Sequence, residues 1–127
     1  MSTPQVGLAY EVAADGTAVV TVSGELDIAS ADGVYSYVRD IIDRHHVPVV
    51  VDLTSLAFCD ARGLGALVRM NNYAAQADCA LLLASPGRQL LKIIRITGLD
   101  RSLAIGVPLA VTALAGQPGV PAKTAVS

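Results

Sequence analysis

A run of branched apolar residues, Val49–Leu53, leads through a short polar turn into a helical pattern that begins at about Ala61. A near-continuous apolar strand is typical of a central strand that is covered on both faces. The helical pattern after the turn extends to about Ala77. This strand–turn–helix unit predicts the α/β class, because strands that alternate with helices form crossover connections and a mostly parallel sheet.

The rest of the chain extends the same alternation. Two strands, Val6–Ala13 and Thr17–Ser23, flank Asp15-Gly16, a pair of residues favoured in hairpin turns where both positions have positive φ. A helix capped by Ser30 should run to about Arg44 and end before Val47-Pro48. The remaining predicted elements are the strand Ala80–Ala84, the helix Arg88–Thr97, the strand Leu103–Ile105 and a last helix at Pro108–Leu114.

The predicted order is therefore ββαβαβαβα, with a mixed, mostly parallel sheet and an antiparallel N-terminal hairpin. A chain of 127 residues fits one domain, which we assign to residues 1–115. Residues 116–127 are mostly Gly, Pro, Ala, Lys, Thr and Ser, and we expect them to be disordered. The apolar fraction of 53% and the aromatic fraction of 4% predict a largely aliphatic core.

Composition argues against several classes of function. The net charge of −2 and the lack of a large basic patch argue against nucleic-acid binding. No segment reaches the roughly 18 uninterrupted apolar residues of a membrane span. The N-terminus has no secretory pattern, so we expect a soluble cytoplasmic protein. Cys59 and Cys79 are interpreted as free thiols, and the basic stripe of Arg88, Lys92 and Arg95 as a solvated helix face.

The start of the second helix is the main candidate for a functional surface. Asp60 is placed to cap it by accepting hydrogen bonds from its first free N–H groups. Gly63 and Gly65 each cost up to about 1 kcal/mol against alanine inside a helix. Two such glycines in one turn indicate close approach by a neighbouring element or by a partner chain.

Helical spacing divides this helix into two faces. The predicted core face contains Leu64, Leu67, Val68, Asn71, Ala74 and Ala75. On the opposite face we predict a partner-binding stripe of Arg62, Ala66, Arg69 and Tyr73. Arginine suits such a surface because its guanidinium binds carboxylates in a bidentate manner.

Two motifs resemble those of the anti-sigma factor antagonists, which are bacterial regulators built on the STAS domain. Leu-Ala-Phe-Cys-Asp-Ala-Arg-Gly-Leu-Gly (56–65) is similar to that family's pattern, hydrophobic-x-Phe-x-Asp-Ser-Ser-Gly-Leu-Gly. Gly-Glu-Leu-Asp (24–27) is similar to the family's loop after the second strand. The order of elements agrees as well, so the resemblance covers about residues 6–114 and implies a single STAS-like α/β domain.

The resemblance implies a function as well as a fold. In that family the antagonist binds an anti-sigma factor that is also a serine kinase, and so frees a sigma factor for transcription. The kinase phosphorylates the first serine of the motif, and the phosphorylated antagonist dissociates. The implied contact residues here are Asp27 and the start of the second helix, with no catalytic residue, metal or cofactor. The chain itself also offers no convincing nucleophile–base pair, phosphate loop or metal cluster, so we expect no enzymatic activity.

This chain departs from the pattern at the phosphorylated position, where it has Ala61, and at the next position, where it has Arg62. Three explanations remain open: an antagonist that is not switched at position 61, a different partner in a larger STAS assembly, or phosphorylation at another hydroxyl, with Thr54 and Ser55 the nearest. Two other classes are a domain that senses a small molecule or nucleotide and an enzyme of receiver-like or thioredoxin-like fold. The lack of a Cys-x-x-Cys pair and of an acidic pocket argues against the second.

Overall fold

The computed structural model describes residues 6–106, which form one six-stranded sheet and its helices. In chain order the elements are β1 (Val6–Val12), β2 (Ala18–Leu26), α1 (Ala31–His45), β3 (Val49–Asp52), β4 (Leu56–Cys59), α2 (Ala61–Gln76), β5 (Leu81–Ala84), α3 (Arg88–Ile96), the 3-10 helix η1 (Leu99–Arg101) and β6 (Ala104–Gly106). The α/β class and the mixed sheet are as predicted. The helix predicted at Pro108–Leu114 and the tail at 116–127 lie outside the described residues.

The sheet has the order β1-β2-β3-β5-β6, and β4 pairs with β2 beyond the end of β3. Only the β1–β2 pair is antiparallel, while β2–β3, β2–β4, β3–β5 and β5–β6 are parallel. The predicted hairpin and crossover connections are therefore confirmed. The strand β4 was not predicted, because its four residues lie in a segment that was predicted to be a turn between β3 and α2.

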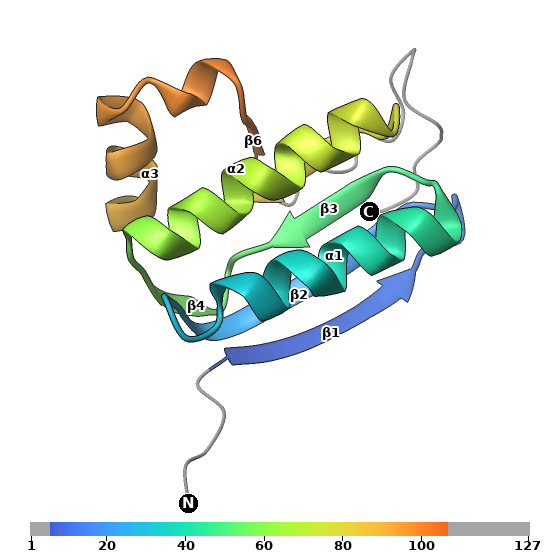
Figure 1. The fold of residues 1–127 in the computed structure, drawn as a ribbon, viewed down its shortest axis with the longest axis horizontal. Coiled ribbons are helices and arrows are strands. Elements are labelled where there is room, and N and C mark those ends of the chain that lie inside the picture. Colours follow the sequence, from blue (N-terminus) through green and yellow to red (C-terminus); the bar gives the residue numbers. More distant parts are fainter. Residues whose placement is uncertain (1–5, 107–127) are drawn as a thin grey trace, which may run out of the picture.

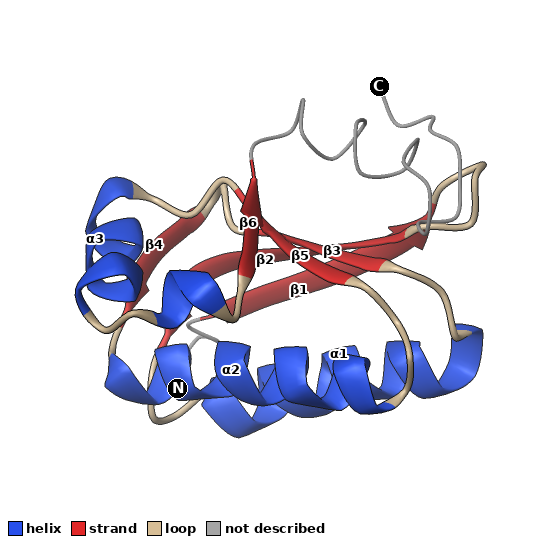
Figure 2. Cartoon of the chain, turned by 90° about the horizontal axis from the view of Figure 1, so that it is seen from above, coloured by secondary structure: helices blue, strands red, loops and turns tan. Residues whose placement is uncertain are grey.

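Two long helices cover one face of the sheet. Figure 2 shows α1 and α2 side by side on that face, and Figure 1 shows α3 at the end of the molecule near the start of α2. Apolar residues of the helices and of β2, β3 and β5 form the main core. The central strand behaves as predicted, since Val49, Val50 and Val51 are each at most 2% exposed.

Local details of the hairpin and of α1 differ from the predictions. The β1–β2 connection spans five residues, because Ala13 N–H donates to the Thr17 carbonyl at 2.8 Å. Only Gly16 has positive φ there (94°), so the two-residue turn was wrong. Ser30 occupies the N-cap position of α1 but makes no forward capping hydrogen bond. The C-cap of α1 is His46, which has a left-handed φ of 53° and donates its N–H to the Ile42 carbonyl.

Candidate functional site

The candidate site is formed by two loops that meet at one end of the sheet. One follows β2 and contains Asp27, and the other joins β4 to α2 and contains Asp60. They are joined by the backbone of Leu26, whose carbonyl accepts a hydrogen bond from Asp60 N–H at 3.2 Å. A Cβ atom at Gly63 would lie 2.3 Å from the same oxygen and 2.9 Å from Cys59 Sγ. Gly63 is therefore needed for close approach within the chain.

Asp60 caps α2 as predicted. Its Oδ1 atom accepts the Gly63 N–H at 2.9 Å, and its carbonyl accepts the Leu64 N–H, also at 2.9 Å. The residue is extended (φ −97°, ψ −170°), which is the usual backbone conformation of an N-cap. A carboxylate at this end of a helix is also favoured by the positive partial charge of the free N–H groups. The cap fixes where Ala61 and Arg62 begin the helix.

Asp27 organises its own loop in a similar way. Its Oδ1 atom accepts the N–H groups of Ala29 at 3.0 Å and Ser30 at 3.2 Å, which is an Asx-type turn. Ser30 Oγ in turn accepts the Asp27 N–H at 3.0 Å and donates to the Glu25 carbonyl at 2.9 Å. The Ser30 hydroxyl thus points back into the loop, which explains why it does not cap α1. The loop leaves Ile28 with 66% of its surface exposed.

A shallow groove lies between the starts of α1 and α2. Its volume is about 260 Å³. Ala61 and Arg62 are exposed at its edge, and Gly65 is half-buried with no atom within 4 Å of a Cβ placed there. The lining residues are Ile28, Ala31, Asp32, Ala61, Arg62, Gly65 and Arg69. Four of these residues were predicted from the sequence, whereas Ile28, Ala31 and Asp32 were not. For Ile28 the reason is that a single apolar residue in a loop gives no periodic signal.

The predicted stripe on α2 is partly wrong. Ala66 is 1% exposed and belongs to the main core. The buried side of α2 consists of Gly63, Leu64, Ala66, Leu67, Met70 and Ala74, so it is turned toward α1 relative to the predicted face. Ala75, predicted to be in the core, is exposed. Asn71 finds a partner, because its Nδ2 donates to the Ser102 carbonyl at 3.2 Å.

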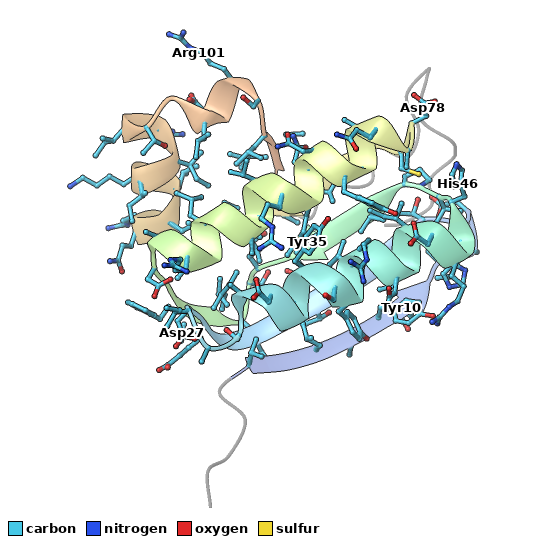
Figure 3. All side chains as sticks on the ribbon, in the orientation of Figure 1. Tyr10, Asp27, Tyr35, His46, Asp78 and Arg101 are labelled. Atoms are coloured by element: carbon cyan, nitrogen blue, oxygen red, sulfur yellow. The ribbon has the colours of Figure 1, made fainter. Side chains whose placement is uncertain are left out.

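Arg69 and Tyr73 contact α1. Arg69 Nη1 is 3.0 Å from Asp32 Oδ1, and its guanidinium lies 4.2 Å from the centre of the Tyr35 ring. The Tyr73 ring meets the Tyr35 ring edge-to-face at 6.4 Å, and its hydroxyl donates to Asp43 Oδ1. This hydrogen bond raises the pKa of Tyr73. Figure 3 shows Tyr35 between the two helices. Arg69 and Tyr73 therefore join α1 to α2.

Arg62, in contrast, forms no ion pair with another side chain within the described residues. The ion pairs there are Arg39–Asp40 at 3.6 Å and Arg69–Asp32 at 3.0 Å. The Arg62 side chain is exposed and leaves its guanidinium available at the edge of the groove. Ala61 beside it presents only a methyl group.

The two hydroxyls nearest to Ala61 in the sequence, those of Thr54 and Ser55, lie between β3 and β4. Thr54 Oγ1 donates to Asp52 Oδ1 at 2.6 Å, and the Thr54 N–H donates to the same atom at 3.0 Å. Ser55 is exposed, and its carbonyl accepts the Gly24 N–H at 3.3 Å. Both residues thus lie on the surface, with Thr54 held by a carboxylate.

The cysteines are free and buried. Burial, followed in size by the charge of Asp60, raises the pKa of Cys59 to about 11. Burial also raises the pKa of Cys79. Both thiols are therefore protonated at neutral pH, where the protonated form is a poor nucleophile. Within residues 6–106 no group of three or more His, Cys, Asp and Glu side chains is arranged to hold a metal ion.

Comparison with known proteins identifies the family. The family model described as "Mlab, STAS domain" matches residues 11–110. An anti-sigma factor antagonist from Mycobacterium paratuberculosis superposes with a TM-score of 0.71 at 24% identity, covering 84% of this chain and 90% of that one. The phosphorylated form of SpoIIAA, a Bacillus cell fate determinant, gives a TM-score of 0.65 at 17% identity, covering 83% and 96%.

The fold is also present in a protein of a transporter family. A sulfate transporter family protein from Wolinella succinogenes gives a TM-score of 0.63 at 18% identity, covering 76% of this chain and 80% of that one. At these identities the structural matches establish the fold alone. The family model covers most of the chain, and on that ground the protein belongs to the STAS domain family.

Proposed function

We propose that this STAS domain is a non-enzymatic, cytoplasmic regulator that binds an anti-sigma factor of the serine-kinase type and so frees a sigma factor for transcription. Its contact surface, which we call the docking surface, consists of Asp27, Ile28, Ala61, Arg62 and Gly65. Asp60 and Gly63 support this surface from below. The structural similarity to anti-sigma factor antagonists supports the choice of partner class.

The observation that carries the proposal is the exposed start of α2 beside Ile28. A side chain that is 66% exposed and apolar is costly to leave in water and gains on contact with a partner. Arg62 adds a guanidinium that can bind a carboxylate in a bidentate manner. The groove of about 260 Å³ is smaller than a typical small-molecule site of about 300–1,000 Å³. A shallow groove with an exposed apolar residue and an arginine suits a protein better than a metabolite.

In the proposed function, phosphorylation at position 61 does not regulate partner binding. Ala61 has no hydroxyl, so nothing there can accept a phosphoryl group. A phosphoryl group elsewhere in the site would add about −1.5 to −2 charges at neutral pH. On Thr54 it would lie against the Asp52 carboxylate that the hydroxyl now contacts at 2.6 Å, which disfavours this alternative site. We therefore propose an antagonist whose binding is not released through this residue.

Two further properties of the chain bear on the class of partner. Among the described residues, no helix has the length and apolar character needed to cross a bilayer. The net charge of −2 gives no general attraction for nucleic acid. A protein partner is thus the class of partner that the surface favours.

Calorimetric titration of the purified chain with a serine-kinase-type anti-sigma factor from the same genome tests the proposal. We expect Arg62→Glu to weaken binding by about tenfold or more, because arginine is enriched among interface hot spots and the substitution reverses its charge. Arg101→Glu is the matched control, since Arg101 is an exposed arginine on η1 outside the docking surface. Figure 3 shows Arg101 at the upper edge of the molecule and Asp27 near the lower edge. Absence of binding by the unmodified chain would contradict the proposal and favour a STAS scaffold in another signalling complex.

A further inference from the structure

The strand β1 forms one edge of the sheet and pairs with β2 alone among the described elements. Figure 1 shows it as the outermost strand. In an antiparallel pair, alternate residues direct their N–H and C=O groups toward the neighbouring strand. Ala13 N–H donates to the Thr17 carbonyl, so Ala13 points toward β2. By this alternation Gly7, Ala9 and Glu11 also point toward β2.

The other residues of β1 direct their backbone groups away from the sheet. These are Val6, Leu8, Tyr10 and Val12, each of which offers one N–H and one C=O at the edge. Their side chains lie on the helix-covered face. There Tyr10 Oη is 3.1 Å from His45 Nε2, and the Tyr10 ring meets the Tyr37 ring edge-to-face. The strand is thus held firmly from one side while its outer hydrogen-bonding groups lack a partner within residues 6–106.

Within residues 6–106, this edge has few of the features by which sheets usually prevent pairing with another chain. Proteins protect exposed edges with proline, lysine, a β-bulge or a very short strand. The seven residues of β1 contain neither proline nor lysine, and their register with β2 is unbroken from Val6 to Val12. Glu11 is the one charged residue in the strand, and Val12 is 45% exposed.

We propose that β1 pairs antiparallel with β1 of a second copy of the chain. The two copies are related by a two-fold axis that runs between the two Ala9 residues, perpendicular to the sheet. This register pairs all seven residues and places outward-directed groups opposite outward-directed groups. Leu8 lies opposite the partner's Tyr10, and Val6 lies opposite the partner's Val12. The result is one continuous sheet across two copies, with the helices of both copies on the same face.

Charge favours this register over its neighbours. With the axis at Ala9, Glu11 lies opposite the partner's Gly7, which has no side chain to oppose it. Moving the axis to Glu11 would place two carboxylates directly opposite each other, which is destabilising. Moving it to Tyr10 keeps the backbone alternation but leaves Val6 and Gly7 without partners. The exposed side chain of Val12 is also covered in the proposed register, by the partner's Val6.

The pairing uses none of the docking surface residues, so it is independent of the proposed function. Each copy would keep its own Ala61 and Arg62 free. Sedimentation velocity over a wide concentration range is the first test, and we expect a species with twice the 13.1 kDa mass of the chain. A chain that stays monomeric at all concentrations would overturn the proposal.

Cysteine crosslinking tests the register. Ala9 faces its own symmetry mate as a pair without direct hydrogen bonds, for which the Cα–Cα distance is about 4.5 Å. This distance is within the disulfide range of about 4.4–6.8 Å, so Ala9→Cys should crosslink on mild oxidation. Glu11→Cys is the matched control on the same exposed face, because the two copies of residue 11 would lie about 13 Å apart. Equal crosslinking of the two variants would overturn the register.

Opposite charges introduced at residue 9 in two variants distinguish pairing between two copies of β1 from pairing of β1 with some other strand. Ala9→Lys and Ala9→Glu each place two like charges opposite each other at the axis, so each variant alone should be monomeric. Mixing the two should restore the dimer. Ala9 is exposed, so both variants should keep the fold of the native chain, which far-UV circular dichroism checks. A dimer that persists in Ala9→Lys alone, or an equimolar mixture that stays monomeric, would overturn the proposal.

Discussion

Gly63 on the first turn of α2 lies directly against the carbonyl group of Leu26, the last residue of β2. A Cβ atom at Gly63 would be 2.3 Å from that oxygen and 2.9 Å from the carbon that carries it. The same carbonyl accepts the Asp60 N–H. Through this contact the loop that contains Asp27 and the start of α2 have a fixed spacing, and the docking surface depends on both.

Gly63→Ala should therefore destabilise the protein. The new methyl group meets backbone atoms, which cannot rotate away, and overpacking of this kind costs about 1–3 kcal/mol of unfolding free energy. Gly65→Ala is the matched control, because a Cβ there has no atom within 4 Å. It should stabilise the helix by up to about 1 kcal/mol. Urea denaturation of the two variants measures the difference, and equal stability would contradict the role assigned to Gly63.

The two arginines of the predicted stripe should now behave differently. Arg69→Glu removes the contact with Asp32 and with the Tyr35 ring and places a carboxylate near Asp32. We expect it to lower the free energy of unfolding by about 1 kcal/mol, since both contacts are exposed. Arg62→Glu should leave stability within about 0.5 kcal/mol, as is usual for surface substitutions. Thermal unfolding gives one readout and partner affinity the other.

The combined outcome is specific. Arg62→Glu should weaken partner binding and leave the unfolding temperature unchanged. Arg69→Glu should lower the unfolding temperature and leave partner binding unchanged. If Arg69→Glu weakens binding as strongly as Arg62→Glu while the fold stays intact, the docking surface extends along α2 as the sequence first suggested.

Position 61 can be tested by restoring a hydroxyl. Incubated with a cognate serine kinase and ATP, the native chain should remain unmodified in intact-mass spectrometry. Ala61→Ser should gain one phosphoryl group, because position 61 is exposed at the helix start. The added charge beside Asp60 and near Asp27 should then weaken partner binding. Labelling of the native chain would show that Thr54, Ser55 or another hydroxyl is the acceptor.

The fold class followed from the sequence because its signals are strong and local. The apolar run at Val49–Val51 and the amphipathic pattern of α1 each allow one reading, and both were confirmed. The strand β4 was missed because Leu56–Cys59 is short and its middle residues, Ala57 and Phe58, are exposed. It is a strand because β2 extends to Leu26 and offers it a partner.

The faces of α2 could not be fixed from periodicity, because the helix contacts both the sheet and α1. Ala66 has a side chain small enough to belong to either face, and it is buried in the core. The partners of Arg69 and Tyr73 are Asp32, Tyr35 and Asp43, which lie 30 or more residues away in the chain. No local pattern indicates such pairings. For the same reason the sequence alone does not predict that Ile28 lines the groove, which forms where the starts of α1 and α2 meet.

The buried thiol of Cys59 gives the stability a defined dependence on pH. Its pKa is about 11 in the folded chain, raised from an ordinary value of 9.0. Below pH 9 the thiol is protonated in both the folded and the unfolded states, and its contribution to stability is fully present. Between pH 9 and 11 the unfolded chain ionises first, so the free energy of unfolding should fall as the pH rises.

Cys59→Ala should remove this part of the alkaline loss. The two proteins differ only at residue 59, so the difference between the two pH profiles isolates the contribution of Cys59. Cys79→Ala is the control, because it keeps the Cys59 thiol and should retain the decline that this thiol causes. Chemical denaturation at a series of pH values gives the profiles. Parallel profiles for the native chain and Cys59→Ala would mean that Cys59 ionises as readily in the folded protein as in the unfolded one, and that its position beneath Asp60 and Gly63 is more open to water than the structure indicates.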